Sequence, residues 1–358
     1  MGLWITLVMK RLAENLRETE CALVAPGSNF FYLTGMEFAG VHERLFTLLI
    51  TKNDEPSVVA PQLYESELEG WAGELHLWKD GEDPLKIVKE VLEGRGVEKL
   101  LVEESIPAGI ILPFIKSYGL EPLGGRIKAL RERKSCEEIE KIKRACVIVD
   151  RVFEELLSTS FEGKKESEIA KLIDDRISEL GGKPSFETIV ASGANGAEPH
   201  HTISTKRIER GDLVVMDYGA RLDGYCSDIT RTVAVKEKKS RAAEVYEIVR
   251  EAQQRAFESV SGSVTAESVD RTAREAITTK GYGENFTHRA GHGLGIDVHE
   301  DPYITQGNKE LLEEGMVFTI EPGIYLKGSL GVRIEDDVAM MNGKGERLTE
   351  AERDLMIV

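Results

Sequence analysis

Short apolar runs alternate with stretches of helical periodicity along the first part of the chain. Four runs have the length and the flanking turn residues of buried strands, and they lie at 22–25, 45–50, 57–60 and 99–102. Around them, apolar residues recur at helical spacing over 7–17, 84–92 and 108–118. Strands that alternate with helices are typical of an α/β fold, so we expect a small α/β domain that ends near Gly124 and Gly125.

The remainder of the chain predicts the same order of elements twice. Ser135, with Glu138 three residues later, forms a capping-box sequence that opens a long helix. A second helix and a hairpin follow, and then two more helices and a second hairpin. In the first half we expect the second helix over 166–180, strands over 186–190 and 212–219, a turn at 221–224 and a further strand that ends at 235. In the second half we expect helices over 242–260 and 266–280 and a hairpin of 317–325 with 332–340. We therefore expect an α/β domain over 1–125 and an α+β domain of two related halves over 126–358.

Composition places the chain among ordinary globular proteins. It has 358 residues, enough for two domains, with 41% apolar and 30% charged residues. The net charge is −17 and the sequence contains no compensating basic patch, so we expect no binding to nucleic acid.

Cysteine usage and the N-terminus bear on the compartment. The four cysteines are scattered and form no C-x-x-C pair, which argues against a disulfide framework and favours the cytoplasm. The apolar run over residues 1–9 follows no basic segment and is too short to cross a membrane. We expect neither a signal peptide nor a membrane anchor, and Met9 is an alternative start.

Four acidic residues lie in or beside apolar strands of the two hairpins. Asp217 follows Leu-Val-Val-Met and Glu321 follows Val-Phe-Thr-Ile, while Asp228 and Glu335 lie on the far side of each turn. Acids in such settings are rarely left unpaired, because a buried charge without a partner is costly. One imidazole, that of His292, among four carboxylates predicts a site for Mn, Co, Fe or Zn rather than calcium. A buried ion-pair network is the alternative.

His292 lies in a glycine-rich segment that also bears two weaker motifs. His288 and His292 have the i, i+4 spacing of helical zinc ligands, but Gly291, Gly293 and Gly295 make a helix improbable there, and no glutamate follows His288. The same glycines imitate a dinucleotide-binding motif without its strand and helix. We therefore expect His292 in a loop. His42 and His76, in the first domain, are expected to be structural.

These residues resemble the pita-bread metallopeptidases. Asp217, Asp228, His292, Glu321 and Glu335 stand in family order, within Asp-Ile-Thr-Arg-Thr and Thr-Ile-Glu-Pro-Gly-Ile-Tyr. The chain is most similar to the Xaa-Pro dipeptidase (prolidase) and aminopeptidase P types. The resemblance covers about 130–358, and the first domain follows the creatinase-type α/β plan in outline. It implies a pita-bread domain with pseudo-twofold halves behind a creatinase-like domain.

The resemblance implies a role for each of these positions. Asp217 would chelate one divalent ion, Asp228 and Glu335 would bridge two ions, and His292 and Glu321 would hold the second. The ions would be Mn, Co, Zn or Fe. The reaction implied is attack by a hydroxide that bridges the ions on the carbonyl carbon before proline.

Further residues are expected around these ligands. Glu321 would shuttle the proton to the leaving nitrogen, while the family's substrate-contacting, oxyanion-stabilising and proline-pocket histidines correspond to His200, His299 and His288. Arg333 shares a strand face with Glu335 and is expected to orient it. A purely structural role is the alternative for His288 and Arg333, and His201 is expected to be a neighbour without a catalytic role.

One segment departs from the family pattern. Some archaeal prolidases carry an arginine after the equivalent of His299-Glu300 that meets the carboxylate of the dipeptide. Here the run is Glu300-Asp301-Pro302-Tyr303. A dipeptidase needs a cation to bind that carboxylate. We therefore expect the cation to come from another segment, for example from the first domain of the partner subunit.

Dipeptidase activity on short proline-containing peptides is the leading expectation, in a homodimer. Aminopeptidase P, which releases the N-terminal residue from longer peptides, is the nearest alternative. A metal-free binding module on the same fold and a creatinase-like amidinohydrolase are the alternatives from other classes, and the intact ligand set disfavours both.

Overall fold

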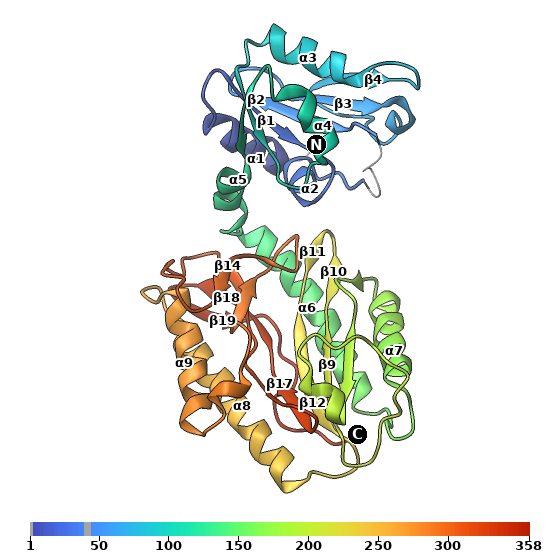
Figure 1. Cartoon of the computed structure of the whole chain (residues 1–358), viewed down its shortest axis with the longest axis vertical. Helices are drawn as coiled ribbons and strands as arrows, with labels where there is room; N and C mark the ends of the chain where they lie inside the picture. Colours follow the sequence, from blue (N-terminus) through green and yellow to red (C-terminus); the bar gives the residue numbers. More distant parts are fainter. Residues whose placement is uncertain (1–2, 39–43) are drawn as a thin grey trace. The chain divides into compact units, whose positions relative to one another are not determined.

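The computed structural model describes residues 3–38 and 44–358 and divides the chain into two units, Met1–Arg131 and Glu132–Val358 (Figure 1). Each unit contains its own sheets and its own buried core. Among the described helices, none combines the length and the apolar composition that a membrane span requires.

The N-terminal unit is built on a six-stranded mixed sheet with the order β4-β3-β2-β1-β5-β6. Its strands are β1 Glu20–Val24, β2 Thr47–Thr51, β3 Ser57–Pro61, β4 Glu74–Trp78, β5 Lys99–Val102 and β6 Gly119–Pro122. The four predicted strands are confirmed as β1, β2, β3 and β5. The pattern missed the edge strands β4 and β6, because most of their residues are exposed or only half-buried and form no continuous apolar run.

The helices of this unit are α1 Leu3–Glu14, α2 Ser28–Thr34, α3 Pro84–Gly94, α4 Ala108–Ile111 and α5 Gly124–Arg131. The helix expected over 108–118 is wrong in length. It stops after one turn and gives way to a 3-10 turn over Leu112–Phe114, since Pro113 cannot donate the hydrogen bond that would continue an α-helix.

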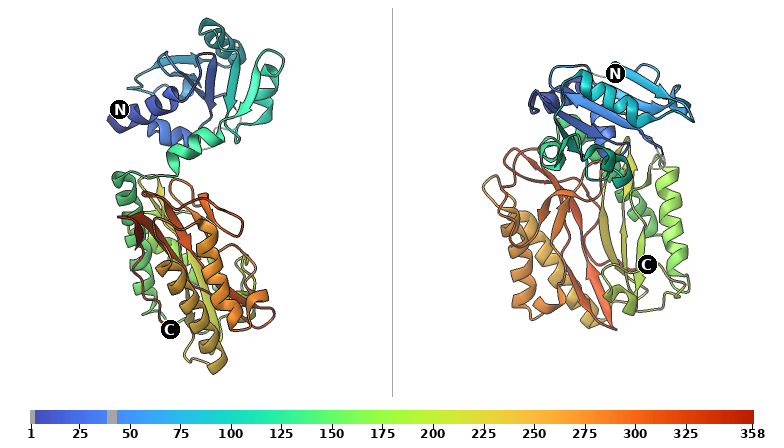
Figure 2. Two further views of the ribbon diagram at one scale, coloured as in Figure 1. Left: turned by 90° about the vertical axis from the view of Figure 1, so that its left-hand side faces the viewer. Right: turned by 45° about the horizontal axis from the view of Figure 1, so that its top comes forward.

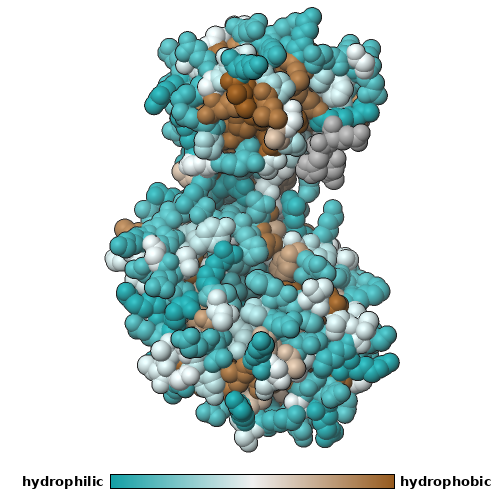
Figure 3. Space-filling model, in the orientation of Figure 1, coloured by the Kyte–Doolittle hydropathy of each residue, from teal (hydrophilic) through white to brown (hydrophobic). Residues whose placement is uncertain are grey.

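Some apolar side chains of the N-terminal unit face solvent. Its visible face carries an apolar patch (Figure 3). Leu112 and Ile115, which follow α4, are among the exposed large hydrophobic residues of this unit, at 60% and 52% of their full exposure. Apolar area of this kind is typical of surfaces that pack against another protein.

The C-terminal unit carries four long helices and two main sheets. The helices are α6 Cys136–Leu156, α7 Glu166–Glu179, α8 Ser240–Glu258 and α9 Ala266–Thr279. The capping box expected at Ser135 and Glu138 is confirmed, and it opens α6. One sheet has the order β12-β9-β8 and the other the order β14-β13-β15-β18-β19. Their strands are β8 Ile189–Ser192, β9 Leu213–Tyr218, β12 Ile229–Ala234, β13 Gly291–Gly293, β14 Glu300–Ile304, β15 Val317–Ile320, β18 Asp336–Met341 and β19 Lys344–Arg347.

Both hairpins are interrupted where the acidic residues stand. In the first half, β9 pairs with β12, and between them β10 Ala220–Leu222 and β11 Tyr225–Cys226 form a separate ladder with β7 Lys183–Pro184. In the second half, β15 pairs with β18, and between them β16 Gly323–Leu326 pairs with β17 Leu330–Arg333. Continuous strands were predicted, but the chain changes sheets near each acidic residue.

The two halves place these acidic residues at equivalent points. Asp217 is the fifth residue from the start of β9, and Glu321 is the fifth residue from the start of β15. Asp228 immediately precedes β12, and Glu335 immediately precedes β18. The residues before α7 and α9, Lys165 and Thr265, also make equivalent isolated bridges, to Arg207 and Leu311. The predicted relation between the halves is confirmed.

Each half packs its own helix pair against its own strands. Figure 2 shows α6 and α7 beside the strands of the first half and α8 and α9 beside those of the second. The two apolar cores are separate clusters, one containing Val149, Ile173 and Met216 and the other containing Val249, Ile277 and Phe318. The strands between the helix pairs therefore converge at the middle of the unit, where the acidic residues lie.

Candidate functional site

A pocket of about 470 Å³ lies entirely within the C-terminal unit. Its lining includes all five predicted metal ligands, Asp217, Asp228, His292, Glu321 and Glu335. It also includes the remaining four predicted site residues, His200, His288, His299 and Arg333. Residues that are up to 135 positions apart in the chain, from 200 to 335, are therefore brought to one cavity by the two hairpins and the loops beside them.

Three of the five predicted ligands form a tight buried group. One donor atom from each of Asp228, His292 and Glu335 lies within 4.8 Å of the others. The Nε2 atom of His292 is 3.6 Å from Oδ2 of Asp228 and 3.7 Å from Oε1 of Glu321. The side chains of Asp217 and Glu321 are each 14% exposed to solvent, so they lie nearer the open side of the pocket.

The electrostatics of the group are unfavourable without a cation. Burial, together with the charges of the neighbouring carboxylates, raises the pKa of Asp228 and of Glu335 well above the usual range. Burial also raises the pKa of Glu321 to about 7. Oδ1 of Asp228 and Oε1 of Glu335 are buried and accept no hydrogen bond from any residue that the structure describes. Such oxygens are costly to bury unless a cation takes the place of a donor.

His292 is suited to donate a lone pair. Burial lowers its pKa to about 3, and the neighbouring His299 adds to the shift, so the ring is neutral at pH 7. Its Nδ1 is 3.1 Å from the carbonyl oxygen of Gly293, which leaves Nε2 directed at the carboxylates. Four carboxylates and one neutral imidazole form a donor set that fits borderline divalent cations.

His292 lies on the short strand β13, so the expectation of a loop is wrong. The flanking glycines allow neighbouring strands to approach the backbone closely. A Cβ atom at Gly291 would lie 2.0 Å from the carbonyl oxygen of Thr319, and one at Gly293 would lie 2.2 Å from that of Asp301. The glycines therefore serve the close pairing of β13 with its neighbours rather than flexibility.

Arg333 contacts a different carboxylate from the one expected. Its guanidinium pairs with Asp217 and also donates to Oγ1 of Thr230 at 3.1 Å. Thr230 in turn donates to Oε2 of Glu335 at 2.7 Å, so Arg333 reaches Glu335 only through that hydroxyl. The expectation assumed a regular strand through both residues. The chain leaves β17 at Arg333 and enters β18 at Asp336, and the alternation of faces is lost between them.

Tyr325, to which the sequence assigned no role, contacts two residues that line the pocket. Its hydroxyl oxygen is 2.8 Å from Nε2 of His288 and accepts a hydrogen bond of 2.8 Å from Arg333. Burial lowers the pKa of His288 to about 3, so this ring is neutral, and its Nδ1 is 2.7 Å from the carbonyl oxygen of Arg289. Nδ1 therefore carries the proton, and the Tyr325 hydroxyl donates to Nε2. The motif Glu-Pro-Gly-Ile-Tyr was the available signal.

The loop that carries His200 is anchored by a buried carboxylate that sequence reasoning also missed. Glu166, on α7, has no exposed surface and accepts hydrogen bonds from the Ser192 backbone at 2.7 Å and the Ser204 hydroxyl at 2.5 Å. Nε2 of His201 is 3.1 Å from the same carboxylate. His201 is thus held on the inner side of the loop, whereas His200 is exposed and lines the pocket.

The second half anchors its histidines in a comparable way from α9. Arg274 donates to the carbonyl oxygens of Phe286, at 3.0 Å, and of His288, at 2.8 Å. Asp270, which is buried and pairs with Arg274, accepts the backbone N–H of Ala290 at 3.1 Å. Side chains of α7 and α9 thus each anchor a loop that carries a histidine of the pocket.

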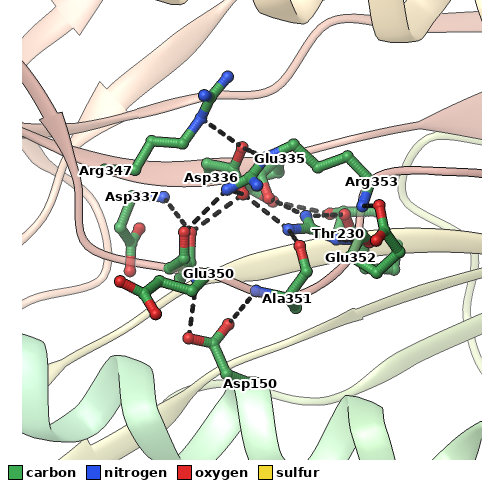
Figure 4. Close-up of polar contacts among 12 residues, drawn as sticks. Asp150, Thr230, Glu335, Asp336, Asp337, Arg347, Glu350, Ala351, Glu352 and Arg353 are labelled. Carbon is green, nitrogen blue, oxygen red and sulfur yellow. Dashed lines mark hydrogen bonds and ion pairs between the residues drawn. The ribbon is translucent and has the colours of Figure 1, made fainter.

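A second buried network holds the backbone of Glu335 in place (Figure 4). Arg231, fully buried on β12, donates to the carbonyl oxygen of Glu335 at 2.5 Å and to Oδ1 of Asp336 at 2.7 Å. It also donates to the carbonyl oxygens of Ala351 and Glu352. Burial would raise the pKa of Asp336, but Arg231 and Arg353 lower it to about 2. The network therefore ties β12, β18 and the C-terminal segment together beside the acidic group.

Replacing Arg231 by methionine is expected to lower the free energy of unfolding by about 3–5 kcal/mol. Asp336 would keep the partly exposed Arg347 and Arg353 but lose its fully buried partner, and the carbonyl oxygens of Glu335 and Ala351 would lose a buried donor. Denaturant titration of the chelator-treated protein measures this. Arg250→Met, which removes an exposed pair with Glu247, is the control and should change the value by less than about 1 kcal/mol. A loss below about 1 kcal/mol for Arg231→Met would contradict the role given to the network.

Comparison with known proteins places this site in a family. The model described as metallopeptidase family M24 matches residues 140–342, and the creatinase/prolidase N-terminal domain matches residues 9–132. A protein named Xaa-Pro dipeptidase from Pyrococcus horikoshii is 39% identical over 94% of this chain and 94% of its own length.

Solved structures agree in fold over the whole chain. A recombinant prolidase from Thermococcus sibiricus is 49% identical, with a TM-score of 0.96 and full coverage of both chains. An X-Pro aminopeptidase from Thermotoga maritima is 35% identical, with a TM-score of 0.85, and covers 97% of this chain and 99% of its own. The chain belongs to metallopeptidase family M24 and carries the creatinase/prolidase N-terminal domain in front of its peptidase domain.

Proposed function

We propose that the protein is an Xaa-Pro dipeptidase, which hydrolyses the peptide bond before proline in dipeptides. The observation that carries this proposal is the buried group of Asp228, His292 and Glu335 inside the pocket of an M24 peptidase. Within the described part of the chain, two carboxylate oxygens of this group have no hydrogen-bond donor. Relatives named Xaa-Pro dipeptidase that match nearly the whole chain support the choice of substrate.

The donor set fits divalent cations, and we assign five residues to hold two of them. Asp217 would hold the first ion, His292 and Glu321 would hold the second, and Asp228 and Glu335 would contribute to both. When bound, such ions supply an acidified water and polarise the substrate carbonyl. We expect Mn, Co, Zn or Fe in this set.

The protein's own side chains then complete the chemistry. Glu321 is assigned to accept the proton of the attacking water and to return it to the departing proline nitrogen. His299 lies against His292, with ring centroids 4.3 Å apart, and is assigned to the developing oxyanion. His200 is assigned to the substrate beside the scissile bond. His288, which is held by Tyr325, is assigned to the wall of the proline pocket.

Turnover of Met-Pro and Met-Pro-Ala tests this function directly. The protein is stripped with chelator, reloaded with Mn or Co, and assayed on both peptides. We expect cleavage of Met-Pro and at most slow release of methionine from Met-Pro-Ala. A preference for the tripeptide would replace the proposal with an aminopeptidase P activity. If the protein binds metal but cleaves neither peptide, its substrate is not an Xaa-Pro peptide. Hydrolysis of creatine would then support the amidinohydrolase alternative.

Three further features belong to the proposal. We expect a homodimer, which the exposed apolar residues Leu112 and Ile115 of the N-terminal unit support. We also expect the protein in the cytoplasm, since all four cysteines are free in the structure. We also expect the five assigned residues to bind the metal, which metal analysis of their variants tests. We expect the domain boundary near residue 125, which limited proteolysis tests.

A further inference from the structure

Asp228 and Glu335, the two shared carboxylates assigned to both ions, are each held from the opposite half of the C-terminal unit. Thr230, on β12 of the first half, donates to Oε2 of Glu335 in the second half at 2.7 Å. Asp337, on β18 of the second half, accepts the backbone N–H of Asp228 in the first half at 2.9 Å. Thr230 lies two positions after Asp228, and Asp337 lies two positions after Glu335. The arrangement is therefore reciprocal and follows the relation between the two halves.

The hydrogen bonds of the Thr230 hydroxyl fix the orientation of Glu335. Nε of Arg333 donates to this hydroxyl at 3.1 Å. Because a guanidinium nitrogen only donates, the single proton of the hydroxyl is left for Glu335. The backbone N–H of Glu335 donates to the carbonyl oxygen of Thr230 at 3.1 Å, so the two residues are also joined through the main chain. Thr230 thus holds Glu335 by its backbone and by one of its carboxylate oxygens.

Asp337 is a carboxylate that lies in the interior behind Asp228. It is fully buried, and its Oδ2 accepts the S–H of Cys146 on α6, at 3.3 Å, as well as the N–H of Asp228. Its Oδ1 has no hydrogen-bond partner in the two described ranges of the chain. Burying a carboxylate in this way costs free energy, which an apolar residue of the same shape would avoid. Costs of this kind are typical of positions that support a functional site.

We propose that Thr230 and Asp337 are positioning residues that set the orientation of the shared carboxylates, so that the site takes up two divalent ions together. This inference rests on the pair of ions in the proposed function. The described residues that line the pocket do not include Thr230 or Asp337, so both act through the ligands that they hold.

The second ion should depend on this orientation more than the first. A carboxylate that is shared by two ions must direct an oxygen to each of them, whereas a ligand of one ion needs to direct only one. Donor atoms of Asp228, His292 and Glu335 lie within 4.8 Å of one another, so rotation of either carboxylate would disperse the group. Loss of either holding contact should therefore leave one ion bound and weaken the other.

The first test removes the hydroxyl of Thr230. Thr230→Val keeps the branched shape of threonine, and Thr230→Ser keeps the hydroxyl. Calorimetric titration of the chelator-stripped protein with Mn²⁺ should give two ions per chain for the wild type. In Thr230→Val the affinity for the second ion should fall roughly 10- to 100-fold, the usual effect of removing a partner of a metal ligand. Thr230→Ser should retain most of this affinity.

Electron paramagnetic resonance gives an independent readout of the pair. Two Mn²⁺ ions that share carboxylates are magnetically coupled, whereas a single bound ion gives the spectrum of an isolated ion. At equal loading, the wild type and Thr230→Ser should give the coupled spectrum, and Thr230→Val should give mainly that of an isolated ion.

The second test separates the hydrogen bond of Asp337 from its charge. Asp337→Leu has a similar shape and no acceptor for the N–H of Asp228, so it should lose the coupled pair. Asp337→Asn removes the charge but keeps an oxygen acceptor, so it should retain the pair. Equal losses in both variants would show that Asp337 acts by charge and would overturn its positioning role. Unfolding in chelator shows whether each variant is folded, and the Thr230 variants keep the inference testable if Asp337→Leu is not.

A buried threonine of the N-terminal unit is the matched control. The hydroxyl of Thr51 donates to Oδ2 of Asp54 at 2.8 Å, and Thr51→Val should change neither the Mn²⁺ affinity nor the spectrum. A coupled pair of wild-type affinity in Thr230→Val would overturn the inference. Equal losses in Thr230→Val and Thr230→Ser, or equal weakening of both ions in Thr230→Val, would also overturn it, because either result indicates general damage to the site.

Both readouts measure binding without turnover, so failure of the inference differs from failure of the proposed function. If the wild type binds a coupled pair but cleaves neither Met-Pro nor Met-Pro-Ala, the dipeptidase proposal fails. Loss of coupling in Thr230→Val would then still support the inference. If the wild type cleaves Met-Pro with one bound ion and no coupled spectrum, the dipeptidase proposal stands and the inference is overturned.

Discussion

Replacing Asp228 by alanine is expected to abolish metal-dependent hydrolysis, with kcat/KM for Met-Pro reduced by roughly three orders of magnitude or more. Asp228 is almost fully buried, and its Oδ2 lies 3.6 Å from Nε2 of His292. Its Oδ1 has no hydrogen-bond partner among residues 3–38 and 44–358. The variant should bind fewer than two ions per chain by elemental analysis after dialysis.

The stability of the same variant distinguishes loss of metal from loss of fold. In the metal-free protein Asp228 is destabilised by burial and by the neighbouring carboxylates, so its removal should not lower the unfolding midpoint in the presence of chelator. Added Mn should raise the midpoint of the wild type more than that of Asp228→Ala. Asp175→Ala, which removes an exposed carboxylate of α7 that pairs with Lys171, is the matched control. Metal-dependent activity near the wild-type value in Asp228→Ala would overturn the proposed centre.

Replacing Glu321 by glutamine is expected to lower kcat by roughly 10²- to 10⁴-fold, the usual contribution of a general acid–base group. The amide has the shape of the carboxylate but cannot accept the proton of the attacking water. Because Asp217, Asp228, His292 and Glu335 remain, only part of the metal binding should be lost.

Pre-steady-state assays at saturating Mn, with metal content measured on the same sample, separate these two effects. Glu284→Gln, at an exposed glutamate, controls for the change of charge. A Glu321→Gln variant that retains full kcat would remove Glu321 from proton transfer. Loss of all bound metal in Glu321→Gln would show that the main role of Glu321 is metal ligation.

The order of elements and the acidic group were predictable because both depend on local patterns. Buried strands carry continuous apolar runs, as in β1 and β9, and the capping box at Ser135 satisfies backbone donors of its own helix. Asp217 and Glu321 were recognisable because each follows an apolar strand sequence, in which a carboxylate is out of place without a partner. The repeated helix–helix–hairpin order likewise revealed the two halves.

The partners of individual side chains were not predictable from such patterns. Arg333 pairs with Asp217 instead of Glu335 because the chain changes sheets between β17 and β18. Glu166 anchors the loop before His200 across 26 to 38 positions of sequence, and Arg231 reaches the C-terminal segment across about 120. No periodicity records these contacts, because each depends on how separate elements pack.

The sequence by itself determined the α/β and α+β character of the two parts, the chemistry of the acidic group and the family to which it belongs. These follow from residue type and spacing, which the chain carries irrespective of its packing. The tertiary structure alone decided which carboxylate oxygens lack a donor within the described part of the chain, that Tyr325 donates a hydrogen bond to His288, and that Arg289 stacks on Tyr303. Those properties arise from distances and burial between distant segments, and only the folded chain sets them.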